Sequence, residues 1–320
     1  MPTQLRKKNQ FKTNVNIYRQ STIEKNLQLR AEIIQAVRQF FIENDYLEVE
    51  TPCRIPAPAP EEYIDAQPSG NWYLHTSPEL CMKRLLAAGH SRIFQICKCF
   101  RQNERGKKHL PELTLLEWYT AGSNYQDVMA QCEALIQFVI RTIGHEGYIR
   151  YQGSKISLNS PWPRITVAEA FDQYCSQPME AALRENRFDE LMAGDIEPRL
   201  GFNKPVFMYD YPAFRGALAR LKPEDHSLAE RFELYAGGLE LCNAFSELTD
   251  SVEQRMRFEW EQNRRRFAGK KIYPMPEEFL RSLGDMPEAG GNAFGIDRLV
   301  MLLADTARID DVVAFTPEEL

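Results

Sequence analysis

The chain has 320 residues, of which 43% are hydrophobic and 26% are charged. This balance is typical of a folded globular protein, and the length is enough for one large domain or two small ones. No apolar run approaches the length needed to cross a bilayer. The net charge of −6 does not favour a protein that grips nucleic acid over a broad surface, although local basic patches exist.

The N-terminal residues and the cysteines also help to define the class of protein. Residues 1–20 are basic and polar without an apolar core, so we expect a disordered tail rather than a secretory signal. Residues 21–320 are expected to form one domain, because no linker divides them. The seven cysteines include no C-x-x-C pair, which argues against a zinc site or a disulfide framework. Cys97 and Cys99 are expected to be packed thiols in a protein of the reducing cytoplasm.

The first third of the chain predicts a helix, strands and a second helix. Apolar residues recur at helical spacing from Leu27 to Asn44. The next segment, DYLEVETP, predicts a short strand that ends at Pro52, and WYLH at 72–75 predicts another. The sequence TSPE at 76–79 is typical of a helix start, and this helix is predicted to run to Gly89. Glu79, in the first turn, would stabilise this helix through the helix dipole, in addition to any other role.

Residues 93–100 and 113–119 predict two strands joined by a charged loop at 101–111. The loop carries Arg101 and His109, which are suited to phosphate oxygens. Glu117 and Tyr119 are two residues apart, so they point to the same face of the second strand, where a carboxylate beside a phenol can hold an ammonium group. An ordinary charged hairpin fits this pattern as well.

The middle of the chain predicts helices at 127–143, 166–174 and 179–192 and a strand at 205–211, but residues 144–204 carry no recognisable chemistry. The segment RFELYAGGLELCNAFSE at 231–247 predicts a hairpin that turns at two glycines. Its acids Glu233, Glu240 and Glu247 are seven residues apart, so they cannot share one face of a regular strand. Either a bend follows Asn243 or Glu247 faces elsewhere, and each acid could also be an ordinary surface residue.

The C-terminal part predicts a charged helix at 252–267 and a glycine-rich strand that leads into a helix. The charged helix ends in a basic cluster, which fits either a solvated helix end or a local nucleic-acid patch: Arg264, Arg265, Arg266, Lys270 and Lys271. The glycine-rich strand is GGNAFGIDR at 290–298, followed by a helical run from 299 to 304. Glycines there let the backbone approach a ligand closely.

Three of these segments resemble the signature motifs of class II aminoacyl-tRNA synthetases, in the right order across about residues 27–315. The helix, strand and Pro52 resemble motif 1, the hairpin at 92–119 resembles motif 2, and residues 290–298 resemble motif 3. The resemblance implies the catalytic fold of that class: α+β (mixed α/β), an antiparallel sheet flanked by helices. It also implies a homodimer built on motif 1.

The lysyl branch of that class is the most similar, since residues 231–247 match its R-F-E-x-x-x-G-G-x-E-x-x-N-G-F-S-E segment. The resemblance implies that Glu233 and Glu240 hold Mg²⁺ against ATP and that Arg101 and Arg298 are catalytic. It implies further ATP contacts from Asn103, Glu104, His109, Glu240, Leu241 and Gly295. It implies a lysine pocket of Ser77, Glu79, Glu117, Tyr119, Asn243, Glu247 and Ala293, in which Glu79 meets the α-ammonium and Glu247 the ε-ammonium. The loop departs from the family at Asn103, Leu110 and Leu113.

Three further features resemble the family of elongation factor P lysine ligases. Motif 1 begins near residue 27, which leaves no room for an anticodon-binding domain; Ala293 stands where lysyl synthetases have Gly; and Ser77 replaces a small apolar residue. The resemblance implies ATP-dependent activation of lysine, preferably (R)-β-lysine, and its transfer to a lysine side chain of elongation factor P. It implies no stable tRNA binding and no membrane. No general base for the transfer is evident.

Two other functions fit the sequence. One is a truncated synthetase-like enzyme that acts on tRNA or on a free amine. The other is a non-catalytic regulatory subunit, which the altered loop residues favour.

Overall fold

A computed structural model describes residues 18–145 and 147–320. Its centre is a nine-stranded sheet of order β1-β5-β6-β14-β13-β12-β10-β9, with β11 paired to β12. Its strands are β1 (Leu47–Glu48), β5 (Arg92–Phe100), β6 (Glu112–Ala121), β9 (Arg164–Thr166), β10 (Val206–Pro212), β11 (Leu221–Lys222), β12 (Asp225–Ala236), β13 (Leu239–Ser246) and β14 (Ala289–Gly295). Among the described pairings only β1/β5 and β9/β10 are parallel, so the sheet is antiparallel through its centre.

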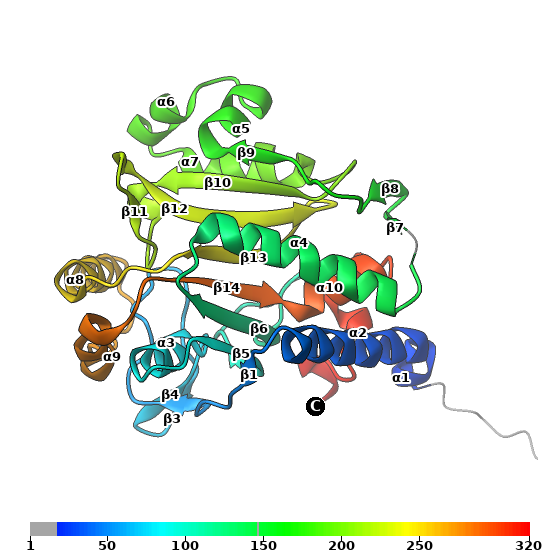
Figure 1. Ribbon diagram of the computed structural model, residues 1–320, viewed down its shortest axis with the longest axis horizontal. Coiled ribbons are helices and arrows are strands. Elements are labelled where there is room, and N and C mark those ends of the chain that lie inside the picture. Colours follow the sequence, from blue (N-terminus) through cyan, green and yellow to red (C-terminus); the bar gives the residue numbers. More distant parts are fainter. Residues whose placement is uncertain (1–17, 146) are drawn as a thin grey trace, which may run out of the picture.

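Three helices cover one face of this sheet: α2 (Glu24–Glu43), α4 (Tyr125–Thr142) and α10 (Ile296–Leu303). Figure 1 shows α2 and α4 crossing the near side of the strands. The helical spacing in α2 brings Phe41 onto the sheet, where its ring stacks on Phe94 at 4.8 Å and lies 5.3 Å from Trp118. The predicted first helix is thereby confirmed, and its apolar stripe joins the main core together with α4 and α10.

The opposite face carries the helices α3 (Glu79–Ala87), α8 (Ser251–Phe267) and α9 (Glu277–Ser282), which pack on Ile93 and Tyr119. A three-stranded sheet lies beside them, formed by β2 (Arg54–Ile55), β3 (Pro68–Ser69) and β4 (Trp72–Leu74). At the β9/β10 end a second apolar cluster is built on α5 (Val167–Tyr174), α6 (Met179–Arg184) and α7 (Phe188–Leu191). The structure also contains a hairpin of β7 (Tyr148–Tyr151) and β8 (Ser154–Ser157) and a short helix, α1 (Arg19–Thr22).

Predicted boundaries differ from the observed ones at the N-terminal side. The strand predicted to reach Pro52 is only Leu47–Glu48. Most of the predicted tail, residues 1–17, lies outside the described residues. The ordered chain already includes Arg19, whose guanidinium pairs with Glu319 at 2.6 Å and donates to the carbonyl oxygen of Asp310. No described helix is both long enough and apolar enough to span a bilayer.

A bend in the β12–β13 hairpin lets Glu233 and Glu240 face the same side, but it lies at a different place from the one predicted. Gly237 and Gly238 form the two-residue turn with φ of 59° and 70°, a left-handed backbone that suits glycine. The strand register then shifts, because Leu234 pairs with Cys242 and Tyr235 with Glu240, which leaves Leu241 as an extra residue. This bulge lies before Asn243, not after it, and it brings Glu240 and Asn243 to the same face.

Candidate active site

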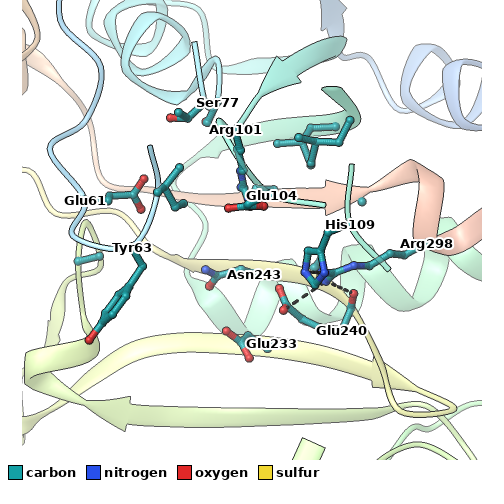
Figure 2. Close-up of a pocket in the computed structure, with 18 of the residues that line it drawn as sticks. Glu61, Tyr63, Ser77, Arg101, Glu104, His109, Glu233, Glu240, Asn243 and Arg298 are labelled. Atoms are coloured by element: carbon teal, nitrogen blue, oxygen red, sulfur yellow. Dashed lines mark hydrogen bonds and ion pairs between the residues drawn. The ribbon is translucent and has the colours of Figure 1, made fainter. Parts of the chain in front are cut away.

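A cleft of about 840 Å³ opens on the face of the sheet opposite α2 and α4. This volume is in the range of small-molecule sites. Every residue predicted for ATP, metal or lysine lines it except Tyr119 and Glu247, which are buried behind its wall. Figure 2 shows side chains from the 101–111 loop, from β12 and β13 and from α10 pointing into the same space.

Arg101 stands at the start of the loop, directly after β5. Its Nε is buried without a hydrogen-bond partner among the described residues, and its guanidinium is 3.7 Å from Glu104. Asn103 has φ of 66°, a left-handed conformation that asparagine tolerates better than glutamate does. Asn therefore suits position 103, and the unpaired Nε of Arg101 is a donor suited to an anion.

Arg298, in the first turn of α10, is held from two sides. Its Nη1 donates to the carbonyl oxygen of Glu240 at 2.8 Å and lies 3.3 Å from that residue's carboxylate. Its Nη2 lies 2.8 Å from Nε2 of His109 (Figure 2). Burial and the Arg298 charge lower the pKa of His109. The imidazole is therefore neutral near pH 7 and can accept the arginine's hydrogen bond.

Three carboxylates meet next to Arg298. Burial and the neighbouring Glu240 raise the pKa of Glu233, and burial, Glu233 and Glu240 raise the pKa of Glu197 to about 7. Glu197 lies in the region where the sequence showed no chemistry. Mutual repulsion of acids beside a phosphate site fits a hard divalent cation such as Mg²⁺. Glu240 is the more available ligand, because Glu233 already accepts hydrogen bonds from Tyr211, Tyr235 and Arg231.

The other end of the cleft is built around Glu117. Its Oε1 accepts a hydrogen bond of 2.6 Å from Ser77 Oγ, and its Oε2 one of 2.9 Å from the Tyr119 hydroxyl. Burial, followed by the nearby Glu79, raises the pKa of Glu117 well above its usual value. Ser77 and Tyr119 thus orient a desolvated carboxylate that lacks a cation.

Lys83, which the sequence did not identify, lies beside this acidic end. Its ammonium is 2.5 Å from Glu79 and 2.5 Å from Glu247, and the side chain has no exposed surface. Burial opposes the lysine charge, but Glu247 and Glu79 outweigh it and raise the pKa of Lys83. The i,i+4 spacing of Glu79 and Lys83 was the available signal.

Glu247 remains incompletely paired in spite of Lys83. Its Oε2 faces the ammonium, whereas its Oε1 is buried with no hydrogen-bond donor among the described residues. Burial raises the pKa of Glu247 to about 8, and Lys83 offsets only part of that effect. A Cβ added to Gly291 would come within 2.1 Å of Oε1, so only glycine leaves space there.

The formal charges at this end do not balance. Counted as ionised, Glu79, Glu117 and Glu247 supply three negative charges, and Lys83 supplies one positive charge. Because burial raises the pKa of Glu117 and of Glu247, the full negative charge develops only when a ligand brings cations into the pocket. The difference is −2, inside a buried pocket where charge is costly unless it is paired. The pocket therefore suits a ligand that brings two positive groups.

Ala293 lies in the middle of this region. The strand register pairs it with Asn243 on β13 and with Glu117 on β6. Its methyl group therefore lies between two pocket residues and lines the cleft. This placement agrees with a role in shaping the pocket.

A loop at 61–65 forms the remaining wall, and the basic cluster of α8 holds it. Arg265, which is buried, donates to the carbonyl oxygens of Glu61 and Ile64 and pairs with Asp65 at 2.7 Å. Arg264 pairs with Glu62. The predicted alternatives for this cluster, a solvated helix end or a nucleic-acid patch, are therefore wrong for Arg265, which is buried in loop contacts, whereas Arg264 stays partly exposed beside Glu62.

The loop brings Glu61 into the cleft. Burial, followed by Glu79, raises the pKa of Glu61 to about 7, and Arg101 opposes this shift. A carboxyl group with this pKa can accept a proton near neutral pH. Sequence reasoning missed it, because nothing local distinguishes this acid from its neighbour.

The antiparallel sheet, with a cleft that has arginines at one end and acids at the other, has the form of a class II synthetase domain. In agreement, the family model for tRNA synthetases class II (D, K and N) matches residues 6–319. A curated relative from Pectobacterium atrosepticum is 38% identical over 92% of this chain and 95% of its own length. A curated relative from Proteus mirabilis is 38% identical over 91% of this chain and 94% of its own length. One from Sodalis glossinidius is 40% identical over 92% of this chain and 95% of its own length. All three carry the name "Elongation factor P--(R)-beta-lysine ligase". The chain belongs to this family of class II synthetase-like ligases.

Proposed function

We propose that this protein activates lysine, preferably (R)-β-lysine, with ATP and transfers it to a lysine side chain of elongation factor P in the cytoplasm. The observation that carries the proposal is the formal charge of −2 at one end of a cleft whose other end presents Arg101 and Arg298. Lysine and β-lysine each bring two ammonium groups and one carboxylate. The names of the relatives support the choice of acceptor.

In the first step the lysine carboxylate attacks the α-phosphorus of ATP, and pyrophosphate leaves. Arg101 binds the α-phosphate through its unpaired donor, and Arg298 binds the γ-phosphate after releasing His109. Glu240, together with Glu233, would hold Mg²⁺, which would supply neutralisation of phosphate charge. The contribution of the protein is positioning and charge stabilisation rather than covalent chemistry.

The pocket distinguishes the two ammonium groups of the substrate. Glu79 receives the one nearer the carboxylate. Glu117 and Glu247 receive the ε-ammonium, because Glu117 is oriented by Ser77 and Tyr119 and Glu247 Oε1 has no other donor.

In the second step the ε-amine of the acceptor attacks the carbonyl carbon of the adenylate, and AMP leaves. The attacking amine must lose a proton. Glu61 receives it, since its carboxyl group lines the cleft and has a pKa near the working pH.

A homodimer fits the surface around motif 1. Ile42 at the end of α2 and Leu47 on the edge strand β1 are 59% and 51% exposed, although both are large and apolar. An unpaired edge with such side chains favours a second copy. Sedimentation at micromolar concentration checks this, and a monomer would argue against it.

Two assays test the proposed function. Lysine-dependent ATP–pyrophosphate exchange is expected, and its absence would favour a regulatory subunit. Purified elongation factor P and bulk tRNA are then offered separately to the charged enzyme. Labelled lysine is expected on elongation factor P, and labelling of tRNA alone would contradict the proposed acceptor.

A further inference from the structure

His75, Cys97 and Cys99 come together behind the lysine pocket. Their side-chain nitrogen and sulfur atoms all lie within 4.8 Å of one another. Cys97 and Cys99 are two apart on β5, so both thiols point to the same face, and His75 follows β4 and covers them. His75 and Cys99 are buried, and Cys97 is half-buried.

The spacing of these atoms matches a tetrahedral thiolate–imidazole centre. With Zn–S bonds of about 2.3 Å and Zn–N bonds of about 2.0 Å, two sulfurs lie about 3.8 Å apart and a sulfur and a nitrogen about 3.5 Å apart. The sulfurs of Cys97 and Cys99 are 3.8 Å apart, and Cys99 Sγ is 3.9 Å from His75 Nε2. Small side-chain rotations therefore suffice to form the three bonds.

We propose that His75, Cys97 and Cys99 bind a soft divalent cation of the zinc type, with water in the fourth position on the half-exposed side of Cys97. Two thiolates and a neutral imidazole balance the charge of such a cation, which suits a buried site. This site is separate from the Mg²⁺ site, whose ligands are carboxylates. The sequence argued against a zinc site, because it holds no C-x-x-C pair, and the proposed third ligand, His75, comes from beside a different sheet.

Metal binding changes the hydrogen bond that His75 makes. In the structure Nε2 of His75 is 2.7 Å from the carbonyl oxygen of Lys98, to which it donates. A metal on Nε2 replaces this donation, so the part-buried Lys98 carbonyl loses its donor, and this loss opposes metal binding. The free energy of the metal–nitrogen bond is expected to exceed that of the lost hydrogen bond. Metal binding is stronger when both thiols are ionised, because the thiolate is the ligand.

The cation would fasten together two segments that carry active-site residues. His75 precedes Ser77 and Glu79 of the lysine pocket, and Cys99 precedes Arg101 of the phosphate site by two residues. The backbone already joins the two segments, through the hydrogen bond of 2.9 Å from Phe100 N to the carbonyl oxygen of His75. The proposed role is to hold these segments together, not to take part in the reaction.

Metal content and spectroscopy of the full chain test this site without using activity. The protein is purified under reducing conditions, and zinc is measured by elemental analysis. About one equivalent per chain is expected. Replacement of zinc by Co²⁺ is expected to give thiolate-to-cobalt charge-transfer bands and the visible bands of a tetrahedral site. Cys97→Ser and His75→Gln are each expected to abolish these bands.

A second thiol pair provides the matched control. Cys132 and Cys242 have sulfurs 3.9 Å apart, but Asn292 rather than an imidazole accompanies them. Cys132→Ser should leave the zinc content and the cobalt spectrum unchanged. The proposal is overturned if the reduced wild type takes up neither metal, if the bands persist in Cys97→Ser, or if they vanish in Cys132→Ser. A Cys97–Cys99 disulfide in place of metal, seen as a mass loss of two hydrogens, would equally overturn it.

Discussion

The ammonium of Lys83 lies 2.5 Å from a carboxylate oxygen of Glu247, and neither side chain has exposed surface. The protein thus places a cation of its own against the acid that the resemblance assigned to the substrate. Because Lys83 also contacts Glu79, one internal charge is shared between two acids. The remaining negative charge is what a lysine substrate can satisfy.

Removing one member of this buried pair should destabilise the protein strongly. Lys83→Met leaves the carboxylate of Glu247 without its cation, which typically costs about 3–5 kcal/mol. The double variant Lys83→Met/Glu247→Gln should recover much of that loss, because the charge that lacks a partner is gone. Urea unfolding of the single and double variants measures the coupling. Purely additive losses would show that the pair is not an energetic unit.

Glu117→Gln should raise the KM for lysine about tenfold or more and leave the KM for ATP unchanged. A hydrogen bond to a charged group is worth about 1.5–3 kcal/mol, and the amide keeps the shape while losing the charge. Pyrophosphate exchange at varied lysine and ATP measures both constants. Glu112→Gln, an exposed acid on the same strand, serves as the control. Equal effects of the two substitutions would contradict a direct role for Glu117.

Lysine binding should release protons near pH 7. In the free protein Glu247 has a pKa of about 8, because burial outweighs Lys83, so this carboxyl group is largely protonated at pH 7. A bound ammonium lowers that pKa and expels the proton. Lysine affinity should therefore rise as the pH increases from about 6 to 8. Calorimetry in buffers of different ionisation enthalpy measures the proton release. Proton uptake on lysine binding would contradict the assignment of the released proton to Glu247.

Ala293→Gly should shift the preference from (R)-β-lysine toward α-lysine. A β-amino acid places its ammonium one carbon further along, and the methyl of Ala293 occupies the pocket between Asn243 and Glu117. One methyl group in a pocket is worth about 1–3 kcal/mol, so the isomer ratio should change by roughly one to two orders of magnitude. Pyrophosphate exchange with both isomers measures this ratio. Ala289→Gly, on the same strand but outside the cleft, should leave it unchanged; an unchanged ratio in Ala293→Gly would mean that Ala293 only packs the strand.

Glu61→Gln should slow the transfer to elongation factor P and spare the activation of lysine. General base catalysis typically contributes about 10²–10⁴-fold, and only the second step needs a proton acceptor in this scheme. The transfer rate of the wild type should also rise as the pH passes about 7, where the Glu61 carboxyl group ionises. Single-turnover transfer from preformed adenylate separates the steps. A comparable loss of pyrophosphate exchange would place Glu61 in activation instead.

The sequence by itself determined the sheet hairpins, the long first helix and the residues along the Arg101 and Arg298 end of the cleft. Local periodicity carries this information: apolar residues at helical spacing predicted α2, and alternation predicted β5 and β6. The resemblance of residues 231–247 to the lysyl branch then placed Glu233 and Glu240 beside Arg298. The structure agrees, since all three line one cleft.

The tertiary structure alone decided how the charges are paired. Glu61 and Glu197 are unremarkable in the sequence, and each gains its raised pKa from burial and from acids distant along the chain. The pKa of Lys83 is raised against the effect of burial, chiefly by the distant Glu247. The bulge at Leu241 is likewise set by strand pairing and not by any local signal. Sheet order brings Glu117, Asn243 and Ala293 into one row, although they are far apart in sequence. Electrostatic partners depend on distance in space and on exclusion of water, and neither is encoded in local periodicity.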